Sequence, residues 1–182
     1  ERLRLRSEVR TRQHALEEIE RILGESISRP VVEIRREDLT EAAVVVVPAT
    51  GPASSLGGTV TRAIVGLRRR LRAQSIRWQP PFGGIFPLDL TEGDVDATVF
   101  VRLAAPAPPW DLATEYLPVG PAAVAVHEGS YAQLPCTYEA MFDWIEEASY
   151  EPVGPVVEEY LSLGSRRDGN PPRTRLLVPL AS

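Results

Sequence analysis

The chain has 182 residues, 43% of them hydrophobic, which is enough to bury the core of one domain or of two small lobes. Its net charge of −5 argues against the broadly basic surface that is typical of nucleic-acid-binding domains. The single cysteine permits no internal disulfide, which fits a reducing, cytoplasmic location, and no apolar run reaches the roughly 18 residues that a membrane span requires.

Residues 1–25 are richer in charge than the rest of the chain, with six Arg, six Glu and no Pro. A heptad register places apolar side chains at five of its seven seam positions, which are Leu5, Val9, Leu16, Ile19 and Leu23. The sequence therefore predicts an N-terminal helix within residues 1–28 that pairs with a second copy as a coiled coil. An amphipathic helix packed on its own domain fits the pattern equally well. The chain begins with Glu rather than Met, so we expect further sequence upstream.

Residues 29–182 contain two related halves. The stretch AVVVVPATG (43–51) resembles AAVAVHEGS (122–130), because each is an apolar, β-forming run that ends in a short turn with Gly and precedes a helical segment. The spacing of apolar residues predicts these helices at about 54–74 and 131–149. A loop with Pro and Gly follows each helix, QPPFGG in the first half and EPVGP in the second.

Two strands are expected after each loop, and one strand leads each half. The predicted strands outside the repeated runs cover 31–37, 82–90, 96–103, 111–117, 156–163 and 173–180, and a Pro-rich linker occupies 103–110. Alternation with a period of two residues and short connections favour a mostly antiparallel sheet with the helices on one face. The expected fold class is therefore α+β, with strand-strand-helix-strand-strand units used twice and a ligand cleft between the pseudo-symmetric halves.

Two adjacent carboxylates, Glu158 and Glu159, lie in the middle of the predicted strand VVEEYLSL (156–163). Alternation places Glu158 and Tyr160 on one face and Glu159 and Leu161 on the other. Because the second face is mostly apolar, we expect it to pack on the core beneath the helices, with Glu159 near a strand edge or in solvent and without a role. The first face carries an acid and a phenol side by side.

The turn HEGSY, the helix through DWIEEASYEP, the segment GPVVEEYLSL and the closing strand RLLVPL together resemble the GyrI-like effector-binding domain. The resemblance covers residues 30–182 and is stronger in the second half. It implies the duplicated architecture inferred above and a place in the sensor half of MerR-type or AraC-type transcription regulators. The N-terminal helix resembles the end of a MerR-type dimerisation helix.

The motif of that family is a Gly–Pro loop followed by a Glu two residues before a Tyr. It carries over onto Gly154, Pro155, Glu158 and Tyr160. Ser130 stands in the turn where many relatives have Pro. The first half offers Ile85 or Phe86, rather than an acid, at the position equivalent to Glu158.

The resemblance implies that Glu158 meets lipophilic cations, as in the multidrug-sensing branch of the family. A poorly hydrated carboxylate attracts a cation more strongly than one in water, and aromatic faces add cation–π attraction. The candidate ligand-binding residues are Glu158, Tyr160, Tyr116, Trp110, Phe86, Tyr138 and Trp144. Five of them have a plainer interpretation: Glu158 as a solvated strand residue, Tyr116 and Tyr138 as core residues, Trp110 as a lobe anchor, and Trp144 as either core or ligand contact.

Two classes of function fit the sequence best. One is the ligand sensor of a MerR-type regulator, homodimeric through its N-terminal helix and bound to DNA only through an upstream domain. The other is a hydrolase of cyclopropane-containing genotoxins, an activity of some relatives, with the pocket Glu assisting the attack of water. A gyrase-binding inhibitor is a third, weaker possibility. The N-terminal helix favours the sensor, and since no GxSxG, P-loop, HExxH or Cys pair occurs, we expect no catalysis, metal or cofactor.

Overall fold

The computed structural model describes residues 32–88, 93–104, 112–162 and 170–181. The predictions for residues 1–28 and for Trp110 lie outside these ranges. In chain order the elements are β1 (Ile34–Leu39), β2 (Ala43–Pro48), β3 (Gly51–Pro52), the 3₁₀ turn η1 (Ala53–Ser55), α2 (Leu56–Ala73), β4 (Trp78–Phe86), β5 (Asp94–Val95), β6 (Thr98–Leu103), β7 (Ala113–Tyr116), β8 (Gly120–Glu128), the 3₁₀ turn η2 (Tyr131–Gln133), α3 (Leu134–Glu147), β9 (Val156–Ser162) and β10 (Arg173–Pro179).

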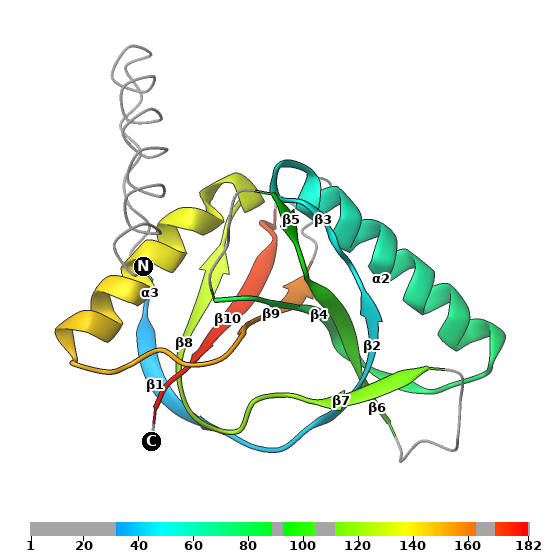
Figure 1. Cartoon of the computed structure of the whole chain (residues 1–182), viewed down its shortest axis with the longest axis horizontal. Helices are drawn as coiled ribbons and strands as arrows, with labels where there is room; N and C mark the ends of the chain where they lie inside the picture. The colour runs from blue at the N-terminus through cyan, green and yellow to red at the C-terminus, as the bar shows by residue number, and fades with distance from the viewer. Residues whose placement is uncertain (1–31, 89–92, 105–111, 163–169, 182) are drawn as a thin grey trace, which may run out of the picture.

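Among the described residues, eight strands form one antiparallel sheet in the order β1-β8-β10-β9-β4-β6-β2-β7, and β3 pairs with β5 apart from it. Helices α2 and α3 lie on the same side of the sheet, α2 over β2 and β6 and α3 over β8 (Figure 1). Four neighbouring strands and one helix make up each half, and the halves meet where β9 pairs with β4. The predicted α+β fold with two related halves is confirmed. Among the described residues, neither α2 nor α3 has the length and apolarity that a membrane-spanning helix requires.

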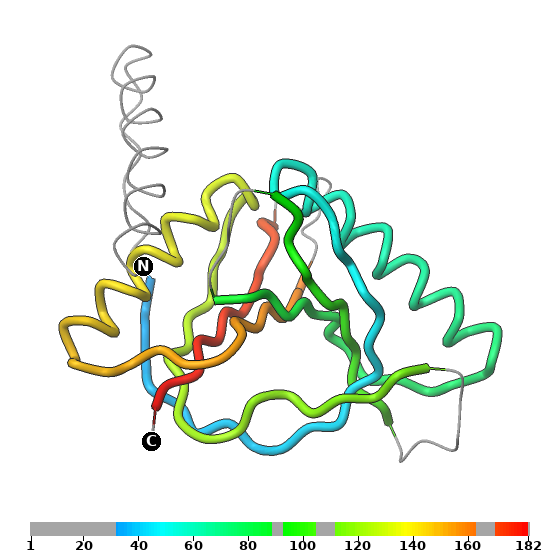
Figure 2. The backbone as a smooth tube through the Cα atoms, in the orientation of Figure 1, coloured from blue at the N-terminus to red at the C-terminus, as the bar shows by residue number. Residues whose placement is uncertain are grey.

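The leading strands exchange halves. Strand β1 precedes β2 in the chain but pairs with β8, and β7 precedes β8 but pairs with β2. The connecting segments 40–42 and 117–119 therefore cross the molecule on the side opposite the helices (Figure 2). The Leu117 N–H donates a hydrogen bond of 3.0 Å to the Ala42 carbonyl, which joins the two segments. The sequence repeat does not reveal this exchange, because the order of elements along the chain is the same with or without it.

Alternate residues of the strands contribute to cores on both faces of the sheet. Val45 of β2 packs beneath α2, whereas its neighbour Val44 belongs to the core on the opposite face, beneath the crossing segments. Leu71 of α2 and Met141 of α3 are fully buried against the face of the sheet that carries the helices. Each such side chain stabilises the fold by about 1.5–3 kcal/mol relative to exposure. Because both faces of the sheet are covered, a polar side chain on a central strand contacts protein rather than water, whichever face it lies on.

The predicted loop QPPFGG is wrong, because these residues lie inside β4. The register of β4 against β6 shifts between Gln79 and Phe82, so Pro80 and Pro81 occupy an irregular stretch of the strand. Prolines have no N–H to donate to a ladder, and such irregularities are where strands accommodate them. The second predicted loop, EPVGP, does precede its strand, since β9 begins at Val156.

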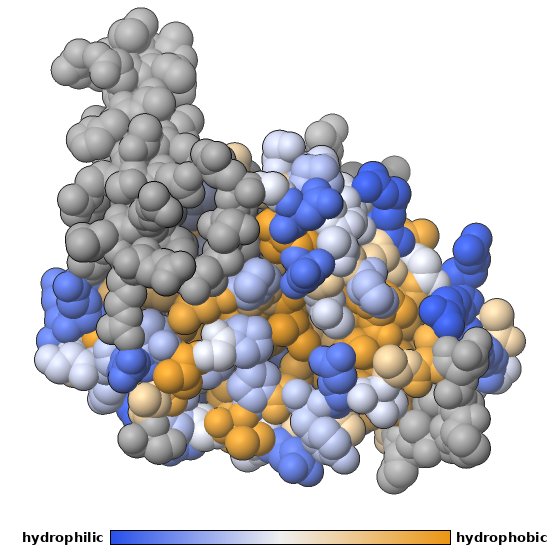
Figure 3. Space-filling view, viewed as in Figure 1, coloured by the Kyte–Doolittle hydropathy of each residue, from blue (hydrophilic) through white to orange (hydrophobic). Residues whose placement is uncertain are grey.

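On the face shown in Figure 3, apolar patches lie between the helices, and the region where α2 ends, at the right, is hydrophilic. Arg68, Arg69 and Arg72 near this end of the helix are exposed. Arg70 and Arg72 lie in the last turn of α2, where the carbonyl groups of a helix favour positive charge. The interaction with the end of the helix is therefore sufficient to explain Arg70 and Arg72.

Candidate ligand-binding site

Glu158 lies at the junction of the two halves. Its strand β9 pairs with β4, and the residue directly opposite it is Gly84. The side chain is directed to the helix-bearing side of the sheet, where it meets Tyr138 of α3. Only 8% of Glu158 is exposed, so this carboxylate is held away from bulk water at the centre of the molecule.

The predicted alternation is confirmed from Val156 to Tyr160, but the prediction of which face lies beneath the helices is wrong. Val156 and Tyr160 pack in the cores beneath the helices, so Glu158 between them shares that side. Val157 belongs to the core on the opposite face, and Glu159 points there too. The assignment failed because both faces of this central strand are buried, and hydrophobicity then does not identify the side that carries the helices.

Leu161, which was expected in the core, is 41% exposed. It lies at a bulge, because Tyr160 pairs with Thr174 and Ser162 pairs with Arg173, so that Leu161 has no partner on β10. A bulged residue leaves the regular alternation of a strand. Leu163, the other residue expected on that face, lies outside the described residues.

Two phenols hold the Glu158 carboxylate. The Tyr138 hydroxyl donates to Oε1 at 2.8 Å and the Tyr160 hydroxyl donates to Oε2 at 3.0 Å, so each oxygen accepts one hydrogen bond. Burial raises the pKa of Glu158, and the hydrogen bonds from Tyr138 and Tyr160 partly offset that rise. Burial, and then the charge of Glu158, raise the pKa of both tyrosines, which keeps them protonated as donors.

Further aromatic rings surround this acid. The Tyr131 ring lies 6.3 Å from the Tyr160 ring in an edge-to-face arrangement, and Tyr131 is 46% exposed. A Cβ atom at Gly84 would come within 2.6 Å of the Phe86 ring and 2.9 Å of the Tyr160 hydroxyl. The glycine opposite Glu158 therefore makes room for both rings.

The structure brings together four of the seven predicted site residues, namely Glu158, Tyr138, Tyr160 and Phe86. Tyr116 is 68% exposed on the edge strand β7, which three other strands separate from β9, and so lies apart from them. The Trp144 ring packs 5.7 Å from the Tyr150 ring, near the end of α3. Tyr131 was missed, although it belongs to the turn HEGSY, because a residue just before a predicted helix gives no sign of where its ring will point.

His127 is fully buried and supports the turn that carries Tyr131. Its Nε2–H donates to the Ser130 carbonyl at 3.0 Å, so its Nδ1 accepts from the Thr137 hydroxyl at 2.8 Å. Both ring nitrogens are thus engaged in structural hydrogen bonds. The neighbouring Glu128 is exposed and pairs with Arg173. His127 and Glu128 accordingly do not form a catalytic pair, as their opposite strand faces predict.

One pH effect follows from the buried acid. Because the pKa of Glu158 is raised in the folded state, the folded chain holds this proton more tightly than the unfolded chain does. That contribution to stability is fully present below the ordinary pKa of a glutamate and is lost as the pH rises through the folded-state value. We therefore expect the free energy of unfolding of Glu158→Gln, relative to that of wild type, to rise as the pH is raised from about 4 to about 7. Urea denaturation of both proteins at the two pH values measures this, and a difference that stays constant or falls would contradict it.

Residues 32–181 match the sequence model of the family described as GyrI-like small molecule binding domain. Solved structures that share the fold include the following three. EcmrR in a complex with DNA is 17% identical, with a TM-score of 0.68 over 100% of this chain and 70% of that one. A hydrolase from Listeria innocua is 15% identical, with a TM-score of 0.55 over 82% and 92%. SAV2435 bound to tetraphenylphosphonium is 13% identical, with a TM-score of 0.52 over 82% and 94%.

At these identities the structural likenesses establish the fold alone. No curated protein matches the chain in sequence. The fold thus occurs in a protein solved on DNA, in a hydrolase and in a protein that holds a lipophilic cation. The chemistry of the individual residues has to decide between such functions.

Proposed function

The chain belongs to the family of GyrI-like small-molecule binding domains, and from that premise we propose that it is the ligand-sensing part of a MerR-type transcription regulator that responds to lipophilic cations. One observation carries the proposal. The buried carboxylate of Glu158 lies among Tyr138, Tyr160 and Tyr131, where the two halves of the fold meet.

An aromatic cation meets two attractions at such a site. The negative charge of Glu158 is poorly hydrated, so its attraction for a cation is weakened by water far less than that of an exposed acid. The ring faces add about 0.5–2 kcal/mol each where they approach the cation. The two phenol donors keep the charge stabilised in the empty state, which explains how the fold tolerates a buried acid that has no basic partner among the described residues.

The solved structures are consistent with this proposal. SAV2435 was solved with tetraphenylphosphonium, a lipophilic cation, and EcmrR was solved on DNA. In the full-length protein, the helix predicted within residues 1–28 would pair two copies, and an upstream domain would contact DNA. Ligand binding at Glu158 would then be coupled to DNA through that helix.

A hydrolase has less support. Hydrolysis needs a base with a free lone pair directed at a water molecule, and a second group that protonates or holds the leaving atom. Each oxygen of Glu158 accepts one hydrogen bond from a phenol, which weakens it as a base although a lone pair remains on each, and both nitrogens of His127, a candidate second group, are engaged. Since the likeness to the Listeria hydrolase establishes only the fold, it does not offset this geometry.

The aromatic part of the site is tested by Tyr131→Leu. This change removes a half-exposed ring beside Tyr160 and leaves Glu158 and its two phenols in place. We expect the affinity for tetraphenylphosphonium to fall by about 0.5–2 kcal/mol, roughly two- to thirty-fold, as measured by calorimetric titration.

Tyr116→Leu is the matched control, because it removes an exposed tyrosine ring from the distant strand β7. It should leave the affinity unchanged. If wild type shows no saturable binding of tetraphenylphosphonium, the proposed function is wrong. If both variants lose affinity equally, the aromatic contact lies elsewhere than at Tyr131.

A further inference from the structure

A hollow lies on the face of the sheet opposite the helices. Its volume is about 260 Å³, and it is bordered by strands β9 and β10 and by the crossing segments 40–42 and 117–119. Leu39, Leu117 and Val157 are among its apolar lining residues, and Arg102, Arg175 and Glu159 form part of its charged side. The hollow therefore combines an apolar wall with a charged one, as small-molecule sites commonly do.

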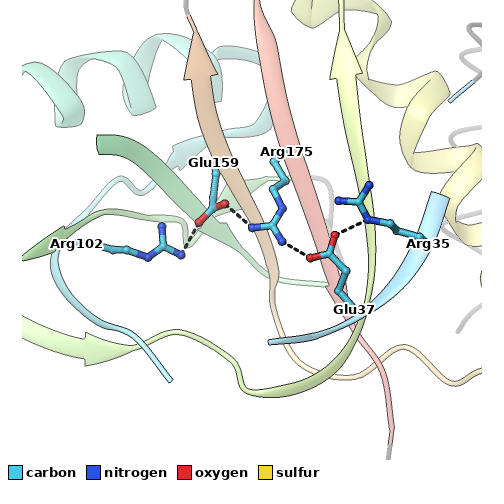
Figure 4. Close-up of polar contacts among 5 residues, drawn as sticks. All are labelled: Arg35, Glu37, Arg102, Glu159 and Arg175. Atoms are coloured by element: carbon cyan, nitrogen blue, oxygen red, sulfur yellow. Dashed lines mark hydrogen bonds and ion pairs between the residues drawn. The ribbon is translucent and has the colours of Figure 1, made fainter. Parts of the chain in front are cut away.

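The charged wall consists of all but the last member of a chain of ion pairs that spans the sheet (Figure 4). In order, the chain is Arg102–Glu159 (2.5 Å), Glu159–Arg175 (3.0 Å), Arg175–Glu37 (2.6 Å) and Glu37–Arg35 (2.6 Å). Four of its five members line the hollow, two arginines and two glutamates whose charges balance, and Arg35 adds one positive charge beyond the lining. Asp38 at the edge of the hollow is exposed and is itself paired with Arg36 at 3.2 Å, which offsets its charge.

Arg102 is the member of this chain that both lines the hollow and has a terminal nitrogen without a partner in the chain. Glu159, Glu37 and Arg175 each use both of their terminal polar atoms on neighbours within the chain. Among the described residues, Arg102 contacts only Glu159, through Nη2, so its Nη1 and Nε remain as donors beside the hollow. The contact is a close ion pair without hydrogen-bond alignment, because Glu159 Oε1 has no hydrogen-bond partner. A guanidinium held in this way can turn to a second acceptor.

We propose that this hollow binds a small organic anion, a monocarboxylate with a short apolar body. The carboxylate would accept hydrogen bonds from Arg102, whose planar guanidinium suits that group. The apolar body would lie against Leu39 and Leu117. The cavity is smaller than the roughly 300–1,000 Å³ of drug-sized pockets, so the ligand has few non-hydrogen atoms.

This site is independent of the one at Glu158. Glu158 and Glu159 are neighbours on β9 but point to opposite faces of the sheet, and the two sites have opposite preferences for charge. Anion binding in the hollow is therefore expected whether or not the Glu158 site binds a cation. The experiment below uses ligands that the Glu158 site does not attract.

The test is a titration of the protein with hexanoate, followed by NMR chemical shifts, for wild type, Arg102→Gln and Arg35→Gln. Both variants remove one positive charge from the same ion-pair chain, but Arg35 does not line the hollow. We expect saturable binding of hexanoate by wild type, an affinity at least about tenfold lower in Arg102→Gln, and an affinity within about twofold of wild type in Arg35→Gln. Hexanamide, which has the same shape without the charge, should show no difference among the three proteins.

A steric variant guards against loss of folding in Arg102→Gln. Ala42→Leu adds volume at the lining of the hollow and leaves every ion pair in place. It should abolish the binding of hexanoate while the thermal unfolding transition remains cooperative. The proposal is wrong if wild type shows no saturable binding of hexanoate, if Arg35→Gln loses as much affinity as Arg102→Gln, or if Ala42→Leu binds hexanoate as wild type does.

Discussion

Replacement of Arg175 by methionine is expected to lower the free energy of unfolding by about 2–3 kcal/mol. Arg175 is the central cation of the ion-pair chain and contacts both Glu159 and Glu37. The Glu159 side chain is only 4% exposed, so the loss of this partner leaves a buried charge poorly compensated. The expected loss is below that of a fully buried pair, because Glu159 keeps Arg102 and the Arg175 side chain is 26% exposed.

The same strand offers a matched control. Arg173→Met removes an arginine from an ion pair with Glu128, at 2.7 Å, in which both side chains are at least half exposed. Such pairs contribute about 0–1 kcal/mol, so this variant should be close to wild type. Urea denaturation of both variants measures the difference. Equal losses would mean that the burial of Glu159 has no energetic consequence.

A second change checks the reason for the loss. If the Arg175→Met protein is destabilised because Glu159 is left with too little positive charge, the addition of Glu159→Leu should restore part of the stability. No recovery would mean that Arg175 acts through its packing rather than through its charge.

The sequence predicts the fold well because its signals are local and repeated. A strand, a 3₁₀ turn and a helix recur in each half, from β2 to α2 and from β8 to α3, and apolar spacing identifies both helices, including the buried pair Met141 and Ile145. Where a local signal misleads, the prediction fails: Pro80 and Pro81 indicate a loop, but the partner strand accommodates them within β4. The pairing of β4 with β6 determines that these residues form a strand, and no property of the six residues QPPFGG predicts it.

The candidate site is predictable only in part, since its partners come from distant segments. The Glu–x–Tyr spacing identifies Glu158 and Tyr160 on one strand face, and their hydrogen bond joins residues two apart. Tyr138 is 20 residues away, on a helix face that also fits simple core packing, so its bond to Glu158 has no signal in the sequence. Arg175 and Glu37 are separated by 138 residues and meet only because β1 pairs with the second half.

Glu158→Gln is the other variant with a large expected effect, on binding rather than on folding. Glutamine keeps the shape of the side chain and removes its charge. The loss of one poorly hydrated charge pair should weaken the binding of a lipophilic cation by about 1–3 kcal/mol, roughly five- to 150-fold. A neutral ligand of similar shape has no such term and should bind both proteins about equally.

The fold should tolerate this change. Tyr138 and Tyr160 can donate to the amide oxygen of the glutamine, although only one carbonyl oxygen replaces the two of the carboxylate. Removal of a buried charge also removes its desolvation cost in the empty state. At neutral pH, stability should therefore be close to that of wild type or slightly higher, in keeping with the raised pKa of Glu158. A large loss of stability would make any loss of affinity uninformative.

The most direct measurement of the central claim is a calorimetric titration of wild type and Glu158→Gln with tetraphenylphosphonium and with neutral triphenylphosphine oxide. If the carboxylate at the junction of the two halves selects cations by its charge, the phosphonium should lose roughly five- to 150-fold in affinity and the phosphine oxide should be nearly unaffected. Equal losses for both ligands would show that Glu158 acts through the shape of the site, and no loss for either would place the cation elsewhere.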